Sequence, residues 1–417
     1  MAKFGTFLRQ LGPGVITGAA NDDPSCIVTY SIAGATLGYA TLWTSLYLLP
    51  LVMVVQWMCA KLGMVSGRGL AGDLRVYFPK WVLLMTCGGL VLANVVTLGA
   101  DLGGMAEVTQ IVTGISSLVW VPLYAVGITA MLFFLSYWEM ERVLKWLALV
   151  LFAYVLSGFM AGPDWGAAFQ RTLVPEVQTT SSYIYVMVAI LGATVSPYFL
   201  FWQASLQVEE EYALGRKTVK ERKGATRSDL QRSQVDVMTG SFISKLITFF
   251  ITLTAAATLF THGQHEIGSP KDAAAALEPI AGKAAAWVFA AGIIGTGLLS
   301  IPTLAGSTAY GVAETARWRS SLHEPPKFAP RFYFTMALAM SVGMGLIYAG
   351  IPVVKMLFWA SILNGILAPW VIGLIVLLTS SERVMGSRRN GRWLRWVGWV
   401  TATITGMAAI TLLLTLL

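Results

Sequence analysis

Long apolar stretches recur along the whole chain and are separated by short polar segments. A helix that crosses the hydrocarbon core of a bilayer needs about 20 mostly apolar residues. By that criterion the pattern predicts about eleven membrane-spanning helices. Their expected limits are 11–37, 42–64, 82–110, 119–136, 143–161, 182–208, 237–260, 285–308, 332–350, 353–379 and 394–416. We therefore expect an all-α integral membrane protein.

Composition supports this interpretation. Hydrophobic residues make up 56% of the 417 residues, charged residues make up 12%, and the mean hydropathy is +0.67. A soluble globular protein averages about 25% charged residues, so this chain has too little charge to cover a surface in water. We expect one transmembrane transport domain over residues 1–417, in contact with membrane lipids. The net charge of +8 comes from loops between spans, so we expect no nucleic acid partner.

Basic residues concentrate in alternate loops. The loops after the second, fourth, sixth, eighth and tenth spans carry most of them, including Arg68, Arg75, Arg142, Arg222, Arg317, Arg319 and Arg388. The opposite loops carry only Arg171, Lys271, Lys283 and Lys355. Cytoplasmic loops are enriched in Lys and Arg, so the N-terminus is expected in the cytoplasm. An odd number of spans then places the C-terminus outside the plasma (inner) membrane.

Two spans are interrupted by proline and polar residues. The first contains Asn21-Asp22-Asp23-Pro24-Ser25-Cys26, and the sixth contains Ala193-Thr194-Val195-Ser196-Pro197-Tyr198. Proline lacks a backbone donor and disfavours helix in the residue before it. The carbonyls that this frees are tolerated at membrane depth only where they face protein or a water-filled cavity. Either break alone would indicate a simple kink. The pair predicts two five-helix repeats of inverted topology, about 11–161 and 182–379, with a substrate site between them and an extra helix at about 394–416.

Asp22 and Asp23 are the acidic residues of the first break. An ionised carboxylate inside a membrane span costs at least about 2.5–3.5 kcal/mol, so it should face a partner or a transport pathway. Paired acids beside free carbonyls make the all-oxygen site that hard divalent cations use. The alternative is that one acid, more readily Asp22 than Asp23, caps the half-helix that starts near Ser25.

Together with Gly12-Pro13-Gly14, these two breaks resemble those of the Nramp family of divalent metal transporters. The resemblance runs through most of the chain and implies a LeuT-like fold. It places the family's metal-binding Asp on Asp23 and the Asn of the same motif on Cys26. In the sixth span it places the metal-binding carbonyl on Ala193, the thioether Met on Ser196 and the following His on Tyr198.

Several positions depart from the family pattern. A thioether favours transition metals over calcium and magnesium, so Ser196 makes the site harder. Cys26 would oppose this trend as a thiolate ligand, whereas a neutral thiol in an apolar span usually behaves as a small hydrophobe. Asp101 matches a family acid associated with proton release, and Gly104 replaces the acid expected three residues later. The chain is similar in these losses to the magnesium-transporting branch of the family.

The resemblance therefore implies transport of Mg²⁺ and Mn²⁺ with little or no obligatory proton symport. The expected metal-site residues are Asp23, Cys26, Ala193 and Ser196, and those expected beside the ion or its pathway are Asp22, Ser25, Tyr198, Asp101 and Ser361. The first alternative is a proton-coupled importer of Mn²⁺ or Fe²⁺. The second is a LeuT-fold carrier of an organic solute. We expect a monomer without a resident cofactor and without enzymatic activity, because the loops contain no nucleophile–base constellation.

Other polar residues lie inside the predicted spans. Gln56, Asn94, Gln203 and Asn364 could line a hydrated path or make hydrogen bonds between helices, and we favour the hydrogen bonds. Segment 209–233, which begins with three glutamates and continues with basic residues, is predicted to be a solvated cytoplasmic connector.

Overall fold

The computed structural model describes residues 21–134, 151–265, 267 and 285–415. All regular structure in these ranges is helical. The first half contains α3 (Pro24–Leu37), η1 (Gly38–Thr41), α4 (Trp43–Tyr47), α5 (Leu49–Ser66), α6 (Leu70–Tyr77), α7 (Lys80–Thr113), α8 (Ser117–Phe134), α10 (Phe152–Met160) and α11 (Trp165–Leu173). The second half contains α12 (Ser181–Thr194), α13 (Pro197–Ala213), α14 (Val219–Arg222), α15 (Arg227–Thr258), η3 (Phe260–His262), α18 (Ala285–Ala316), α19 (Pro330–Tyr348), α20 (Val353–Ser380), α21 (Glu382–Met385), η5 (Gly386–Arg388) and α22 (Arg392–Thr415).

Nine of the predicted spans are confirmed as helices long and apolar enough to cross a membrane, within the described part of the chain. They are Trp43–Ser66, Lys80–Thr113, Ser117–Phe134, Ser181–Ala213, Arg227–His262, Phe289–Ala316, Pro330–Tyr348, Val353–Ser380 and Arg392–Thr415. The predicted spans 11–37 and 143–161 begin outside the described residues. Their described parts are α3 and α10.

The prediction that residues 209–233 form a solvated connector is wrong at both ends of the segment. Helix α13 continues to Ala213, and Glu209 is buried in it, accepting hydrogen bonds from Tyr310 Oη at 2.6 Å and Ser321 Oγ at 2.9 Å. Helix α15 already begins at Arg227, because Thr226 and Asp229 cap its first turn reciprocally. Such a capping box satisfies backbone donors at a helix start, so the connector shortens to 214–226.

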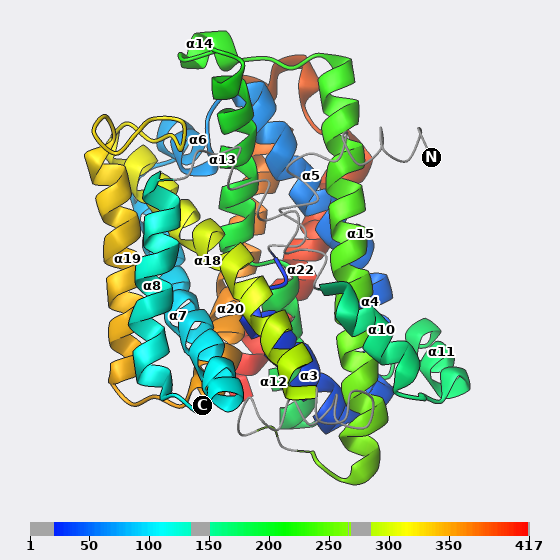
Figure 1. Ribbon diagram of the computed structural model, residues 1–417. Coiled ribbons are helices and arrows are strands. Elements are labelled where there is room, and N and C mark those ends of the chain that lie inside the picture. The colour runs from blue at the N-terminus through cyan, green and yellow to red at the C-terminus, as the bar shows by residue number, and fades with distance from the viewer. Residues whose placement is uncertain (1–20, 135–150, 266, 268–284, 416–417) are drawn as a thin grey trace, which may run out of the picture.

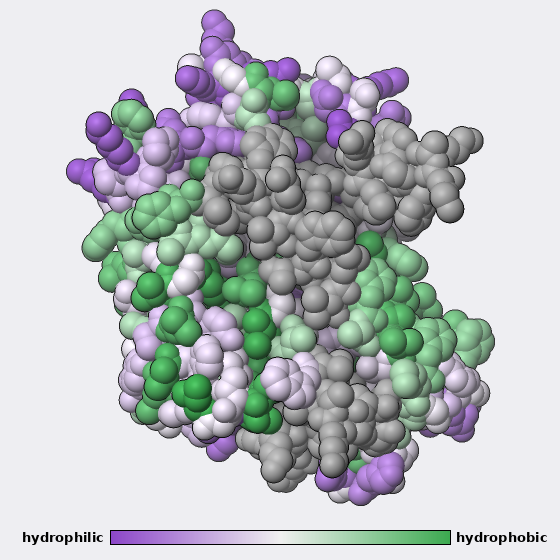
Figure 2. All heavy atoms as spheres, viewed as in Figure 1, coloured by the Kyte–Doolittle hydropathy of each residue, from purple (hydrophilic) through white to green (hydrophobic). Residues whose placement is uncertain are grey.

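The outer surface is apolar around its middle. Figure 2 shows this band, with hydrophilic side chains gathered at the end of the molecule where α6 and α14 lie in Figure 1. Phe134 is 85% exposed, and Val126 and Phe334 are also largely exposed. A soluble protein rarely shows so large an apolar surface, so this band is the one that contacts lipid.

The two interrupted helices lie inside the bundle. Helix α3 packs against α12, α15 and α20, and α13 packs against α5 and α18. The close approach of α12 to α20 depends on glycine: a Cβ added to Gly192 would lie 1.9 Å from the Ser361 carbonyl oxygen. Small residues permit such helix contacts in membrane bundles, and here the contact brings the sixth-span break next to α20.

Candidate functional site

The sixth span is broken between α12 and α13. Helix α12 ends at Thr194, Ser196 has an extended backbone, and Pro197 opens α13. The last carbonyls of a helix have no partner within it, so those around Ala193 are available to other groups. Ser196 Oγ donates to the Gly192 carbonyl at 2.7 Å. The predicted break is thus confirmed.

The first break is organised by Asp23. Its backbone is extended, and its Oδ1 accepts hydrogen bonds from the Cys26 amide at 2.7 Å and from Ser25 Oγ at 2.6 Å. Its Oδ2 accepts a hydrogen bond from Tyr198 Oη at 3.0 Å. Asp23 therefore caps α3, whereas the sequence analysis offered capping only as an alternative, and more readily for Asp22 than for Asp23. The reason is position: Pro24 begins the helix, which makes Asp23 the N-cap residue.

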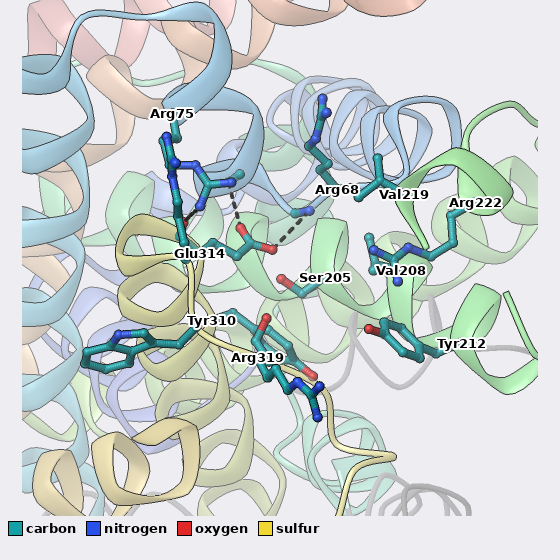
Figure 3. Close-up of a pocket in the computed structure, with 15 residues that line it drawn as sticks. Arg68, Arg75, Ser205, Val208, Tyr212, Val219, Arg222, Tyr310, Glu314 and Arg319 are labelled. Atoms are coloured by element: carbon teal, nitrogen blue, oxygen red, sulfur yellow. Dashed lines mark hydrogen bonds between the residues drawn. The ribbon is translucent and has the colours of Figure 1, made fainter. Parts of the chain in front are cut away.

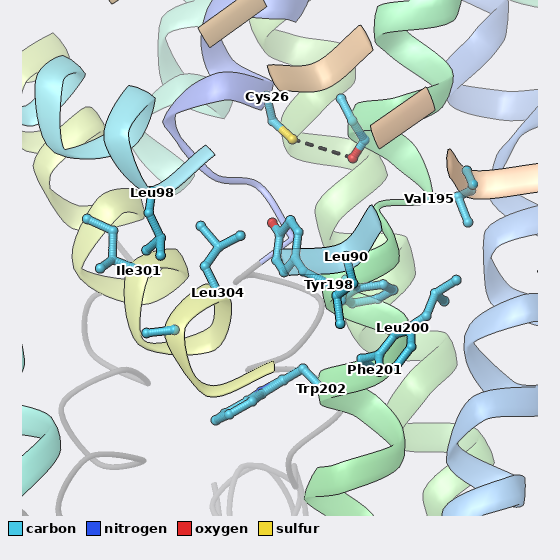
Figure 4. Packing of buried hydrophobic residues seen from close by; sticks show 14 of the residues in the cluster. Cys26, Leu90, Leu98, Val195, Tyr198, Leu200, Phe201, Trp202, Ile301 and Leu304 are labelled. Atoms are coloured by element: carbon cyan, nitrogen blue, oxygen red, sulfur yellow. Dashed lines mark hydrogen bonds between the residues drawn. The ribbon is translucent and has the colours of Figure 1, made fainter. Parts of the chain in front are cut away.

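The two breaks contact each other directly. Asn21 Nδ2 donates to the carbonyls of Ala193 at 3.2 Å and Thr194 at 3.4 Å. Cys26 Sγ lies 3.0 Å from the Asn21 carbonyl oxygen and 3.4 Å from that of Ala193; the dashed line from Cys26 in Figure 4 marks the second contact. A thiol that donates to carbonyl oxygens is protonated. The structure therefore brings two of the predicted site residues, Cys26 and Ala193, into contact. It also places Asn21 in this contact, although the sequence analysis assigned Asn21 no role.

Asp22 points away from this contact, towards α15. Its Oδ1 accepts a hydrogen bond from Ser244 Oγ at 2.8 Å, and its Oδ2 has no hydrogen-bond partner among the described residues. The neighbouring Lys245 is 4% exposed, and its Nζ donates to Tyr30 Oη and Thr194 Oγ1, both at 2.9 Å. The ammonium is near enough to Asp22 for electrostatic attraction.

Lys245 is a functional candidate that the sequence reasoning missed. A charge at this depth in an apolar span was itself a signal, because such residues are costly and usually face a partner or a pathway. Asp22 and Lys245 have opposite charges, so each reduces the free-energy cost of burying the other. The pair also places a positive charge beside the carbonyls of the sixth-span break.

Two further predicted residues border the first break. Ser361 Oγ accepts a hydrogen bond from Thr29 Oγ1 at 3.0 Å and donates to Ser25 Oγ at 3.3 Å, so α20 joins the cluster. Asp101 Oδ2 accepts a hydrogen bond from Ser300 Oγ at 3.0 Å, and its carboxyl is close enough to Asp23 for electrostatic repulsion. Asp101 thus lies beside the site rather than in its hydrogen-bonded centre.

The donor atoms gathered here are mainly oxygens. Within the described ranges, no group of three His, Cys, Asp or Glu side chains is arranged to hold a metal ion. Three buried acceptor atoms, Asn21 Oδ1, Asp22 Oδ2 and Asp101 Oδ1, have no hydrogen-bond partner in the same ranges. Buried polar atoms without partners are uncommon. An ion at this site would therefore meet carbonyl, amide, hydroxyl and carboxylate oxygens, the ligands of hard divalent cations.

The polar residues elsewhere in the spans connect helices, as favoured from the sequence. Asn94 Nδ2 donates to Ser307 Oγ at 2.9 Å and to Thr308 Oγ1 at 2.8 Å. Gln56 Nε2 donates to Gln203 Oε1 at 3.0 Å, and Asn364 Nδ2 donates to Thr97 Oγ1 at 3.4 Å. These bonds join α7 to α18, α5 to α13 and α20 to α7.

The profile of the family described as "Natural resistance-associated macrophage protein-like" (Nramp) matches residues 14–415. The chain belongs to the Nramp family. It is 27% identical over 403 residues to the divalent metal cation transporter MntH of Klebsiella pneumoniae, covering 95% of this chain and 92% of that protein. It is 28% identical over 432 residues to the transporter of the same name from Listeria monocytogenes, covering 99% and 91%.

Solved structures agree on the fold of this Nramp protein. A manganese transporter of Eremococcus coleocola superposes with a TM-score of 0.77 at 18% identity, covering 98% of this chain and 86% of that one. Mhp1, a nucleobase-cation-symport-1 family transporter, superposes with a TM-score of 0.60 at 13% identity, covering 97% and 93%. The LeuT-like fold that the resemblance to the Nramp family implied is confirmed.

Proposed function

We propose that this Nramp-family chain carries divalent metal ions across the membrane, with Mg²⁺ and Mn²⁺ as cargo and little or no obligatory proton symport. Its MntH relatives are named as divalent metal cation transporters, and its structural neighbour as a manganese transporter. The observation that carries the proposal is the oxygen-rich contact between the two breaks. Asn21 and Cys26 from one break meet the Ala193 carbonyl of the other.

The proposed ligands are the Asp23 carboxylate, the Ala193 carbonyl and the Ser196 hydroxyl, with Cys26 beside them. The Cys26 sulfur donates hydrogen bonds to carbonyls, which supports a neutral thiol rather than a soft thiolate. Hard oxygen ligands suit Mg²⁺ and Mn²⁺ better than softer transition metals. Mg²⁺ also keeps several waters when bound, so this short ligand set is sufficient for a partly hydrated ion.

The proposed weak proton coupling rests on the absence of an imidazole near the site. His262 is the last residue of η3, His265 follows it, and His323 lies between α18 and α19. Histidine is the side chain best suited to relay protons near neutral pH.

Proton-coupled Mn²⁺ import is the second candidate. Asp101 supports it, because a buried carboxyl oxygen without a hydrogen-bond partner among the described residues could accept a proton. A carrier of an organic acid is less favoured, since the Asp22 and Asp23 carboxylates would repel a substrate carboxylate.

The proposal includes a location and an orientation. One pocket at a single end of the bundle is lined by basic residues from three connecting segments, namely Arg68, Arg222 and Arg317. This gathering of basic residues supports a cytoplasmic location for that end, by the positive-inside rule. The N-terminus would then be cytoplasmic, the C-terminus outside the plasma membrane, and the transporting unit a monomer.

The test is ion flux into proteoliposomes. Uptake of Mg²⁺, Mn²⁺ and Ca²⁺ is measured separately while an enclosed dye reports the internal pH. We expect uptake of Mg²⁺ and Mn²⁺ without acidification. Uptake of Mn²⁺ alone, with acidification, would instead establish the proton-coupled candidate.

Substitution of Asp23 tests whether the measured ion uptake depends on the proposed site. Asp23→Ala should abolish uptake, because it removes the proposed carboxylate ligand and the cap of α3. Asp164→Ala is the matched control, since Asp164 caps α11 through a hydrogen bond of 3.0 Å from the Ala167 amide and lies away from the breaks. Unchanged affinity and uptake in Asp23→Ala would exclude Asp23 as a ligand.

A further inference from the structure

A polar pocket lies at the end of the bundle where α6, α13, α14 and α18 meet. It has a volume of about 280 Å³. Five arginines line it, Arg68, Arg75, Arg222, Arg317 and Arg319, whereas Glu314 is its single lining carboxylate. Figure 3 shows the labelled arginines around the pocket with Glu314 near Arg75. The lining therefore carries a strong excess of positive charge.

Glu314 offsets only part of this excess, because it is one carboxylate among five arginines. Asp73, which lies 3.7 Å from Arg68 outside the lining, offsets a further part. The Glu314 carboxylate accepts hydrogen bonds from the Gly69 amide at 3.1 Å and the Gly72 amide at 2.8 Å, at the start of α6. Arg75 donates to the Glu314 backbone carbonyl. Burial, together with the neighbouring Arg317 guanidinium, lowers the pKa of Arg75 from its usual value. The guanidinium groups thus repel one another across the pocket.

Arg317 is held there at a conformational cost. Its φ is 60°, and it is the only residue other than glycine with a positive φ in the described ranges. Helices commonly end with a left-handed residue, usually glycine, because a side chain is disfavoured there. The Trp318 amide donates a hydrogen bond to the Ala313 carbonyl at 2.8 Å, which ends α18. An arginine where glycine would fit better points to a use for the guanidinium.

We propose that this pocket binds a phosphate-bearing anion, which bridges the start of α6, the α14 segment and the end of α18. Arginine is suited to phosphate because its planar guanidinium donates paired hydrogen bonds. The volume lies just below the roughly 300–1,000 Å³ typical of ligand pockets, which fits one or two phosphoryl groups. A lipid headgroup and a soluble phosphate share this chemistry, and basic pockets between membrane helices are known to bind anionic headgroups.

The test compares the full-length protein with a variant that should fold. Arg317→Gly combined with Arg319→Gln removes two guanidinium groups that are exposed, and the glycine also relieves the left-handed backbone. The matched control is Arg227→Gln combined with Arg232→Gln, two exposed arginines of α15 outside the pocket. Thermal unfolding without added anion checks that both variants fold.

Two arms distinguish the source of the anion. In detergent, calorimetric titration with inorganic pyrophosphate should give binding that weakens more than about tenfold in the pocket variant and not in the control. In nanodiscs, replacing part of the phosphatidylcholine with phosphatidylglycerol should raise the Tm of the wild type and the control but not of the pocket variant. Pyrophosphate binding without a rise in Tm in the nanodisc arm identifies a soluble phosphate, and a rise in Tm with phosphatidylglycerol identifies a lipid headgroup. If neither probe separates wild type from the pocket variant, the proposal is overturned.

Discussion

Tyr198 gives the sharpest test of how an ion would reach Asp23. The Tyr198 hydroxyl donates to Asp23 Oδ2 at 3.0 Å, while Oδ1 already accepts two hydrogen bonds. The carboxylate is therefore occupied by protein donors, and an ion that binds it must displace at least one of them. Displacement of the Tyr198 hydroxyl from Oδ2 would leave the cap of α3 in place, because the Cys26 amide donates to Oδ1.

Tyr198→Phe removes that donor and keeps the ring. A hydrogen bond to a charged group is worth about 1.5–3 kcal/mol. If the ion displaces the hydroxyl, the variant should bind Mg²⁺ or Mn²⁺ more tightly by up to about 10–150-fold. The ion-free protein should also become less stable, because Asp23 loses a donor while it stays buried.

The assay is thermal unfolding of the purified protein with and without Mg²⁺ and Mn²⁺, with Kd measured by calorimetry. We expect a lower Tm without ion and a larger rise in Tm with ion, since ligands that bind the folded state stabilise it by mass action. Tyr154→Phe is the matched control, because the buried Tyr154 hydroxyl has no hydrogen-bond partner among the described residues. A tenfold loss of affinity in Tyr198→Phe would refute the reasoning and make the hydroxyl part of the ion-bound site.

Three further outcomes are expected. Lys245→Met should tighten binding of divalent cations roughly tenfold in the same calorimetric assay, because a nearby unit charge contributes on the order of 1 kcal/mol or more; unchanged affinity would show that the ammonium does not act on the ion. Ser196→Met should shift transport preference from Mg²⁺ towards Mn²⁺ and Cd²⁺ in competition flux, and indifference to the change would contradict the hard-site argument. Burial raises the pKa of Asp73 in α6 to about 7, so the folded state holds this proton more tightly than the unfolded state and loses stability as the pH rises from about 4 to 7. Asp73→Asn should therefore raise the Tm at pH 8 and leave it nearly unchanged at pH 4, and an equal change at both pH values would contradict this account.

Much of the fold could be predicted because hydrophobicity and proline act locally. Apolar length identified the nine spans that the structure describes in full, and Pro197 marked the break between α12 and α13. The predicted connector over 209–233 failed for a different reason. Glu209 looks like a solvated acid in the sequence, but Tyr310 and Ser321 supply donors from a distant segment. A charged residue can be buried when the fold provides such partners, and no local pattern reveals them.

The sequence by itself determined that this protein is a helical membrane bundle with two interrupted spans and acids in the first. Those features depend on burial in lipid and on proline geometry, which act within one segment. Only the tertiary structure decided which groups meet: Asp23 with Tyr198, Asn21 with Ala193, and Lys245 with Thr194. These pairs lie far apart in the chain, and they form because helix packing brings the two breaks together. The reason is the distance along the chain over which each feature is set. Whether a segment spans the bilayer depends on that segment's own residues, whereas a site requires several helices to pack in one arrangement.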